Sequence, residues 1–308
     1  MNASQKLILC SLLVVLHVAW LSNSFAATNS INPIADAFVT QGATGSLSVS
    51  NFGGGGALLV ASPGLPNGEF QTVMKFDLSG ARAAFNAQFG AGLWAVKSVT
   101  LQLTAQPHSN PIYNPVAAGQ FSISLMKNNS WVEGTGMAST PTSDGISFST
   151  LISTCINTNA DQFLGTFDYD GGSTNTVDAT LSLTSGLIDG ITAGTNLSLR
   201  LYAADAGISF QFNSRSGSPA ATRPLLTITA VPQPRITSVA FSVGNLVIAG
   251  TNGLAGAAYN VLTSADLRLP LENWAPLATN TFDTSGNFTL TNPVNATTGQ
   301  QFYLLRLP

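Results

Sequence analysis

The sequence predicts an all-β protein built from two antiparallel sandwiches, and three observations lead to this fold class. Apolar and polar residues alternate in short runs such as Val99-Thr100-Leu101-Gln102-Leu103. Clusters of Gly, Asn, Pro and Ser separate these runs, which is typical of strands joined by turns. A helical pattern stands out once, over 81–89, where an Ala-rich segment ends at Gly90. We therefore expect a jelly-roll-like antiparallel β-sandwich followed by a smaller sandwich, with helix nearly confined to 81–89.

Residues 1–27 have the features of a secretory signal peptide. Lys6 supplies a positive start, an apolar run extends from Leu7 to Leu21, and small residues follow around Ala26. Cleavage is expected after Ala26, or alternatively after Ala27, which predicts a secreted or cell-surface protein. The alternative interpretation of the same run is a buried or anchoring N-terminal helix.

The strands of the larger unit are expected where the alternation is clearest. They are 96–104, 121–125, 181–183, 197–201 and 226–229. A further strand contains Met74, Phe76 and Leu78, which share one face, while Lys75 and Asp77 share the other. We expect Phe76 to be buried in the core.

A boundary between two units is expected at Val231-Pro232-Gln233-Pro234, because two prolines in four residues interrupt strand pairing and stiffen a linker. The larger unit then spans 28–230, the linker 231–235 and the smaller unit 236–308. Strands of the second unit are expected at 236–241, 246–248, 259–262, 288–290 and 302–305. Its length suits a small immunoglobulin-like or fibronectin-like sandwich.

Composition excludes several classes of function. The net charge is −3, charged residues make up 8% of the chain, and Lys and Arg are scattered singly, unlike in a nucleic-acid-binding protein. After the N-terminal run, no apolar stretch approaches the roughly 20 residues of a membrane-spanning helix. Hydrophobic residues make up 44% of the chain, which is enough to build a core and argues against an intrinsically disordered protein.

Groups that could perform catalysis are scarce. Cys155 is the one cysteine outside the signal peptide, and we interpret it as a small buried residue rather than a reactive thiol. His108 is the one histidine there, in a proline-containing loop, and no Gly-x-Ser-x-Gly motif accompanies it. One thiol and one imidazole do not make a zinc site. The sequence therefore predicts that the protein is not an enzyme.

Asp168-Tyr169-Asp170-Gly171-Gly172 places two carboxylates on alternate positions before a glycine turn. Calcium prefers such oxygen-rich loops, although the glutamate that closes a twelve-residue calcium loop is missing. Asp168 and Asp170 are thus candidate calcium ligands, with a plain turn as the alternative. No other cofactor is expected.

Aromatic rings beside turn residues are candidates for stacking on sugar rings. Tyr113, between two prolines, and Tyr169 are expected to be exposed on loops. Trp131 is a further candidate, although core positions are favoured for both Trp94 and Trp131.

Several short motifs together resemble one family. They are Asp36-Ala37-Phe38-Val39, Leu58-Leu59-Val60, Met74-Lys75-Phe76-Asp77-Leu78-Ser79, Val99-Thr100-Leu101-Gln102-Leu103, Trp131-Val132-Glu133-Gly134-Thr135, Phe210-Gln211-Phe212-Asn213-Ser214-Arg215 and Arg223-Pro224-Leu225-Leu226-Thr227-Ile228. In this order they make the segment 32–230 similar to the DNRLRE domain, a secreted bacterial β-sandwich grouped with carbohydrate-binding module family 96.

The resemblance implies a non-catalytic protein that binds an extracellular polysaccharide or cell-surface matrix. The alternative is a structural or adhesive cell-surface protein without a specific small ligand, which low charge and Thr- and Asn-rich strands suit equally. A polysaccharide lyase or hydrolase is the least favoured interpretation.

Overall fold

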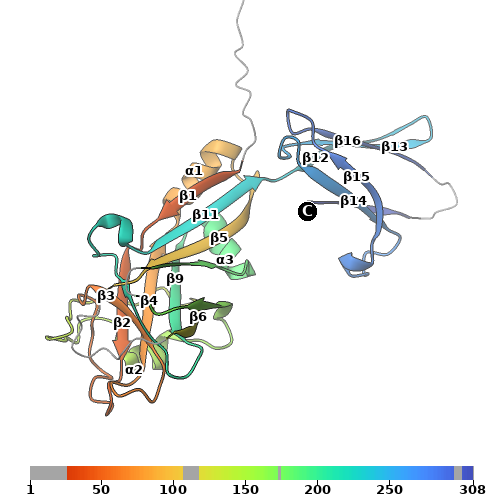
Figure 1. Ribbon diagram of the computed structural model, residues 1–308. Coiled ribbons are helices and arrows are strands. Elements are labelled where there is room, and N and C mark those ends of the chain that lie inside the picture. The colour runs from red at the N-terminus through yellow and green to blue at the C-terminus, as the bar shows by residue number, and fades with distance from the viewer. Residues whose placement is uncertain (1–25, 107–117, 173–174, 295–299, 308) are drawn as a thin grey trace, which may run out of the picture.

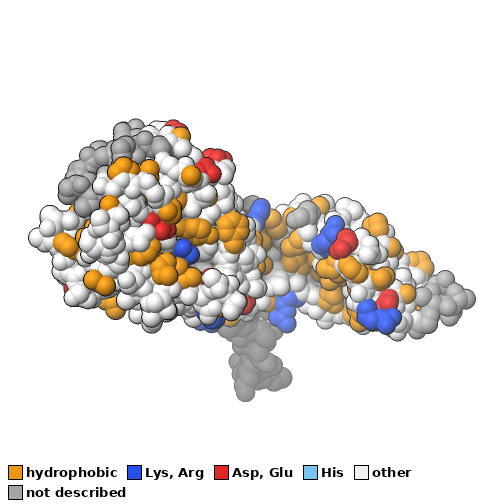
Figure 2. All heavy atoms as spheres, turned by 90° about the horizontal axis from the view of Figure 1, so that it is seen from below, with side chains coloured by type: hydrophobic (Ala, Val, Ile, Leu, Met, Phe, Trp, Pro, Cys, Tyr) orange, Lys and Arg blue, Asp and Glu red, His pale blue; other side chains and the backbone are white. Residues whose placement is uncertain are grey.

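The computed structural model describes residues 26–106, 118–172, 175–294 and 300–307, and it shows two β-sandwich units joined end to end (Figure 1). Figure 2 shows two lobes with a narrower waist, and backbone and uncharged polar side chains, both white, cover most of the larger lobe. The predicted all-β sandwich class is confirmed.

The first sheet of the larger unit has four antiparallel strands in the order β1-β11-β5-β8. Their bounds are β1 (Ala27–Ile31), β11 (Leu225–Pro232), β5 (Trp94–Thr104) and β8 (Thr176–Thr180). The first and last strands of this unit, β1 and β11, therefore lie side by side, and Ala27 pairs with Ala230.

The second sheet has seven strands, with six in the order β10-β3-β4-β9-β6-β7 and β2 paired with β4. Their bounds are β10 (Ser209–Asn213), β3 (Ala57–Ala61), β4 (Phe70–Asp77), β9 (Asn196–Ala203), β6 (Gly119–Met126), β7 (Gln162–Tyr169) and β2 (Ala35–Thr40).

The main core fills the space between these two sheets. Val99, Leu101 and Leu103 of β5 are fully buried there, as their alternation predicts. Phe76 is also fully buried and belongs to the same cluster as Met74, so the predicted face of β4 is confirmed.

The other face of the seven-stranded sheet is covered by the segment that follows β6. Trp131 and Cys155 pack there against Val39 and Val73. The segment includes the short helix α2 (Phe148–Thr150) and a π-helical turn, η1 (Leu151–Cys155). Cys155 is a buried free cysteine, which confirms its interpretation as a small core residue.

One amide anchors this covering segment to the sheet. The side-chain nitrogen of Asn51, a fully buried residue, donates to the carbonyls of Glu133 (2.6 Å) and Ile146 (2.8 Å), while its Oδ1 accepts from the backbone N–H groups of Gly53 (3.1 Å) and Gly136 (3.0 Å). A Cβ at Gly136 would collide with the backbone of Asn51, so the close approach requires glycine.

Helix α1 spans Ser79–Phe89 with Gly90 as its C-cap, which confirms the expected helix. The expectation that helix is nearly confined there is wrong, because α3 (Ser185–Ala193) covers one end of the seven-stranded sheet. Its Leu187 and Ile191, one turn apart, are buried, and this burial outweighs the low helix propensity of its two glycines.

The expected strand at 181–183 is also wrong, since β8 ends at Thr180 and those residues are irregular. A 3₁₀ turn, η2 (Ala220–Thr222), precedes β11.

The smaller unit packs two three-stranded sheets, ordered β12-β13-β16 and β15-β14-β17. Their bounds are β12 (Arg235–Ser242), β13 (Asn245–Thr251), β16 (Phe288–Pro293), β15 (Ala275–Thr281), β14 (Ala258–Ser264) and β17 (Phe302–Arg306), with a 3₁₀ turn η3 (Leu271–Asn273). The five expected strands are present. The sequence prediction missed β15, because it contains Pro276 and none of its seven residues is buried.

The connection between the units is shorter than the predicted 231–235. Strand β11 continues through Pro232, which pairs with Trp94, and β12 starts at Arg235. Pairing with β1 stops at Ala230, so Pro232 sits where the strand loses one neighbour. The Asn252 side chain of the second unit donates to the carbonyls of Leu93 and Gln233, both at 2.7 Å, and so ties the two units together.

Within the part of the chain that the structure describes, no helix has the length and apolar character needed to cross a membrane.

Candidate functional site

Trp131 lies in the core, as favoured from the sequence, and its ring is not free to stack on a sugar. The indole is 6% exposed, and its Nε1 donates to Ser198 Oγ at 2.9 Å. The ammonium of Lys75 lies 4.5 Å from the ring centroid and donates to the Trp131 carbonyl at 2.6 Å. Burial lowers the pKa of Lys75, which a nearby Cys155 partly opposes. Trp131 and Lys75 therefore hold the covering segment against the seven-stranded sheet.

The prediction that Tyr169 is an exposed loop ring is wrong. Tyr169 is the last residue of β7, and the centroid of its ring lies 4.9 Å from that of Phe210 and 5.1 Å from that of Phe212. Its hydroxyl donates to the Gly172 carbonyl, and burial raises its pKa to about 12. The strand extends further towards the glycine turn than its alternation indicates, and this places the ring inside the sandwich. Tyr113 and His108 lie outside the described residues.

Both candidate calcium ligands accept hydrogen bonds from neighbouring groups of the protein. Asp168 Oδ1 accepts from Gln120 Nε2 at 2.9 Å, while the two oxygens of Asp170 accept from the Gly172 N–H and Asn175 Nδ2, both at 2.8 Å. Among the described residues, no group of three or more His, Cys, Asp or Glu side chains is arranged to hold a metal ion. A calcium site at Asp168 and Asp170 stays a prediction.

Three residues from the family-like motifs meet in an ionic cluster, in which Asp36 is buried and Glu133 and Arg215 are partly exposed. Arg215 forms a two-pronged ion pair with Glu133, at 2.7 and 2.5 Å. The Asp36 carboxylate accepts from the Arg215 backbone N–H at 2.6 Å, and the Asp36 N–H donates to Glu133 at 3.0 Å. Burial raises the pKa of Asp36 to about 7, and the Glu133 carboxylate beside it acts in the same direction. Through Asp36, which is 1% exposed, this cluster joins β2 to the segments after β6 and β10.

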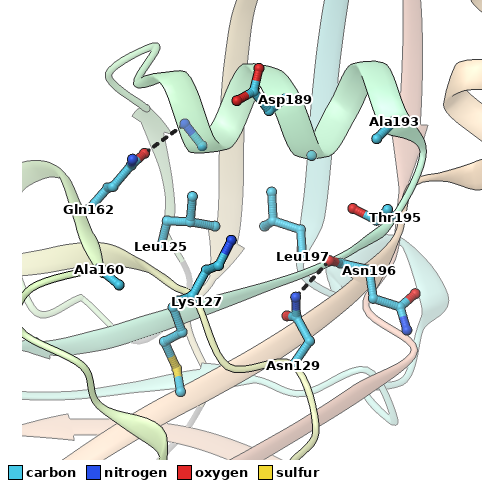
Figure 3. A pocket seen from close by; sticks show the side chains of 13 residues that line it. Leu125, Lys127, Asn129, Ala160, Gln162, Asp189, Ala193, Thr195, Asn196 and Leu197 are labelled. Atoms are coloured by element: carbon cyan, nitrogen blue, oxygen red, sulfur yellow. Dashed lines mark hydrogen bonds between the residues drawn. The ribbon is translucent and has the colours of Figure 1, made fainter.

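A cleft with a volume of about 400 Å³ lies under α3 (Figure 3). The end of β6, the start of β7 and the start of β9 complete its walls. It is lined by Leu125, Met126, Lys127, Asn129, Ala160, Gln162, Gly186, Asp189, Gly190, Ala193, Thr195, Asn196 and Leu197. Its volume falls within the roughly 300–1,000 Å³ of small-molecule sites.

The cleft combines an apolar floor with polar groups. Figure 3 shows Leu125 and Leu197 facing each other beneath α3, with Lys127 extending towards the space between them. Neither Lys127 nor Asp189, both exposed, takes part in the ion pairs of the described residues. Such a surface suits an uncharged polyol, which offers both C–H faces and hydroxyl groups.

Asn129 fixes one wall of this cleft. Its Nδ2 donates to the Asn196 carbonyl at 2.9 Å, whereas its Oδ1 is buried and has no hydrogen-bond donor among the described residues. A buried acceptor without a donor is costly, typically by about 1–3 kcal/mol. Because this oxygen has less than 1 Å² of accessible surface, it is closed off from the cleft, and the Asn129 amide instead holds the start of β9.

Two glycines of α3 keep the cleft open. Gly186 donates its N–H to Gln162 Oε1 at 2.9 Å, and a Cβ there would collide with the same oxygen. A Cβ at Gly190 would make ordinary contacts, 3.8 Å from Leu197 and 3.9 Å from Thr195, and so would occupy part of the cleft. Sequence reasoning missed this site because it missed α3. The signal was present, since Thr184, Leu187, Ile191 and Gly194 fit a helix start, a buried face and a helix end.

Comparison with known proteins gives weak likenesses. No protein-family description and no curated protein matches the chain. Solved structures include a β-glucuronidase from Ruminococcus gnavus, with 9% identity, 88% of this chain covered and a TM-score of 0.23. A β-1,2-glucanase from Parabacteroides distasonis gives 11% identity, 92% coverage of this chain and a TM-score of 0.23. This chain spans 40% and 37% of their lengths. Scores this low carry no argument about function, and membership of the DNRLRE family stays a prediction.

Proposed function

We propose that this protein binds an extracellular polysaccharide without cleaving it, and that the cleft under α3 holds a sugar unit. The observation that carries the proposal is a cleft of about 400 Å³ that combines an apolar floor, made by Leu125 and Leu197, with the polar side chains of Lys127, Gln162 and Asp189. Asp189 is the one carboxylate among the lining residues, whereas glycoside hydrolysis ordinarily requires a pair. These features support binding rather than catalysis.

The test is binding of the protein to a panel of neutral and acidic polysaccharides by affinity electrophoresis, followed by calorimetry with short oligosaccharides. Gly190→Ala should weaken binding about tenfold, because its methyl group narrows the cleft. Alanine also favours a helix over glycine by roughly 0.5–1 kcal/mol, so the variant should be at least as stable as the parent protein.

Gly80→Ala is the matched control. Gly80 lies in α1, and a Cβ there would meet no atom within 4 Å. It should raise the melting temperature in the same way while leaving binding unchanged. Equal binding by the Gly190 variant would refute the cleft as the site.

Affinity should depend weakly on salt, because the cleft offers one cation rather than a basic cluster. A steep loss of binding with salt would instead point to an acidic glycan gripped by charge. Failure to bind any polysaccharide would refute the proposed function and favour the structural or adhesive alternative.

A further inference from the structure

The first strand of the smaller unit, β12, has an uncovered apolar face. All eight of its residues are exposed, although it pairs along its length with β13. Val239 lies opposite Ile248 and Phe241 lies opposite Leu246, and residues directly opposite in an antiparallel pair share a face. Because Ile248 and Leu246 are buried in the core, Val239 and Phe241 point to the same inner side. They are nevertheless 60% and 77% exposed, so the opposite sheet does not reach over them.

The free edge of β12 lacks the charges and prolines that usually prevent strands from pairing between molecules, and its β-bulge lies before Ser238, so that the stretch from Ser238 to Ser242 is regular. Between Ile236 and Ser242 it contains neither a charged residue nor proline. Several other outer strands carry such features, namely Pro276 in β15, Asp178 in β8 and Asp168 in β7. Charges and prolines protect exposed edges from association, and their absence leaves this edge competent to pair.

The turn after β12 adds an unusual apolar residue to the same edge. Val243 is 97% exposed and has φ of 49°, and Gly244 follows with φ of 78°. Two positive φ values make a type I′ turn, in which Asn-Gly is the favoured pair and a β-branched residue is strained. An exposed valine therefore occupies a position where asparagine would be more stable, which indicates a use for its apolar side chain.

We propose that β12 is a self-association surface, on which two copies of this chain pair edge to edge as antiparallel strands. A two-fold axis at Ala240 places Val239 of each copy opposite Phe241 of the other, so both apolar faces stay on one side. Arg235, the one charge on the strand, then lies at opposite ends of the pair and meets no like charge. The paired sheets become one continuous six-stranded sheet across the two copies.

The exposed apolar area indicates a weak dimer. Ile236, Val239, Phe241 and Val243 are 50%, 60%, 77% and 97% exposed. If a large aromatic side chain offers about 150–250 Å² and the others somewhat less, the four expose roughly 400–500 Å² per copy. Two copies would bury about 800–1,000 Å², slightly below the ~1,200 Å² of standard stable interfaces. The dimer should thus be reversible and visible at high protein concentration.

Sedimentation velocity of the protein from micromolar to millimolar concentration tests the proposal. The parent protein should shift from monomer towards dimer, and Phe241→Lys should raise the dissociation constant at least tenfold, because it places a charge on the inner face. Phe163→Lys is the control, since Phe163 is 56% exposed on β7, an outer strand of the larger unit, and this variant should behave like the parent.

Val243→Asn separates association from folding. It should relieve the turn and raise the melting temperature, yet weaken the dimer several-fold by removing apolar surface. A parent protein that stays monomeric at every concentration overturns the proposal and leaves the edge to another partner. A dimer that survives Phe241→Lys and Val243→Asn overturns it as well, since a different surface would then be responsible.

Discussion

Replacing Asp36 by asparagine should change how the stability of this protein depends on pH. Burial raises the pKa of Asp36 to about 7 from its ordinary 3.8. Between these values the folded chain keeps the proton that the unfolded chain releases. The folded state therefore binds more protons, and its stability falls as pH rises from about 4 to about 7. Above pH 7 both states have lost the proton and this contribution is constant.

The magnitude follows from the same pKa difference. Each pH unit between the two values corresponds to about 1.4 kcal/mol, so the total is roughly 4 kcal/mol. An asparagine at this position cannot ionise, and its side-chain oxygen can still accept the Arg215 N–H. The free energy of unfolding of Asp36→Asn, relative to that of the parent, should therefore rise by about 4 kcal/mol between pH 4 and pH 8.

Urea unfolding of both proteins at several pH values measures this difference directly, and any constant cost of the substitution cancels in the comparison. Asp178→Asn, on the exposed surface of β8, is the control and should follow the parent protein. The reasoning is refuted if the stability difference between Asp36→Asn and the parent is the same at pH 4 and pH 8, or if it moves in the opposite direction.

Three further substitutions test the packing and the acid response. Phe76→Ala should cost about 3–5 kcal/mol in denaturant titration because it empties a fully buried site, whereas Phe163→Ala should cost under about 1 kcal/mol; a small loss at Phe76 would contradict its burial. Tyr169→Phe should cost about 1 kcal/mol by removing the hydroxyl that donates to Gly172, and should leave polysaccharide binding unchanged, which calorimetry would show. Hydrogen bonds from Thr142 and Thr135 lower the pKa of Asp144 to about 2, so its contribution to stability is lost as pH falls from about 4 towards 2; acid titrations followed by circular dichroism should show a shallower acid decline for Asp144→Asn than for the parent.

The alternation of apolar and polar residues predicted the orientation of side chains correctly wherever one face of a strand is buried and the other faces solvent. It identified the inward residues of β5 and the buried face of β4, because side chains alternate with a period of two. It failed where burial depends on distant segments. Tyr169 follows the polar Asp168 at the end of β7, yet Phe210 and Phe212 of another strand enclose its ring. The two glycines of α3 lower its helix propensity, so the sequence pattern predicted neither this helix nor the cleft beneath it.

The ionic cluster shows a different limit of the sequence. Asp36, Glu133 and Arg215 stand out as parts of short motifs, but their separation along the chain gives no sign that they touch. Their meeting depends on the pairing of β2 with β4 and on the course of the covering segment. Long-range contacts of this kind follow from topology rather than from local residue patterns.

The Asn51 amide has a consequence for the motions of the larger unit. The Gly53 and Gly136 amide protons, from segments far apart in the chain, are both held by the single Oδ1 of Asn51. Each proton can exchange with deuterium of the solvent only after its hydrogen bond to this shared oxygen breaks. Because the same side chain also fastens Glu133 and Ile146, its release frees the whole covering segment at once. The segment and the loop after Asn51 should therefore open as one cooperative unit, with a common exchange rate for both amides.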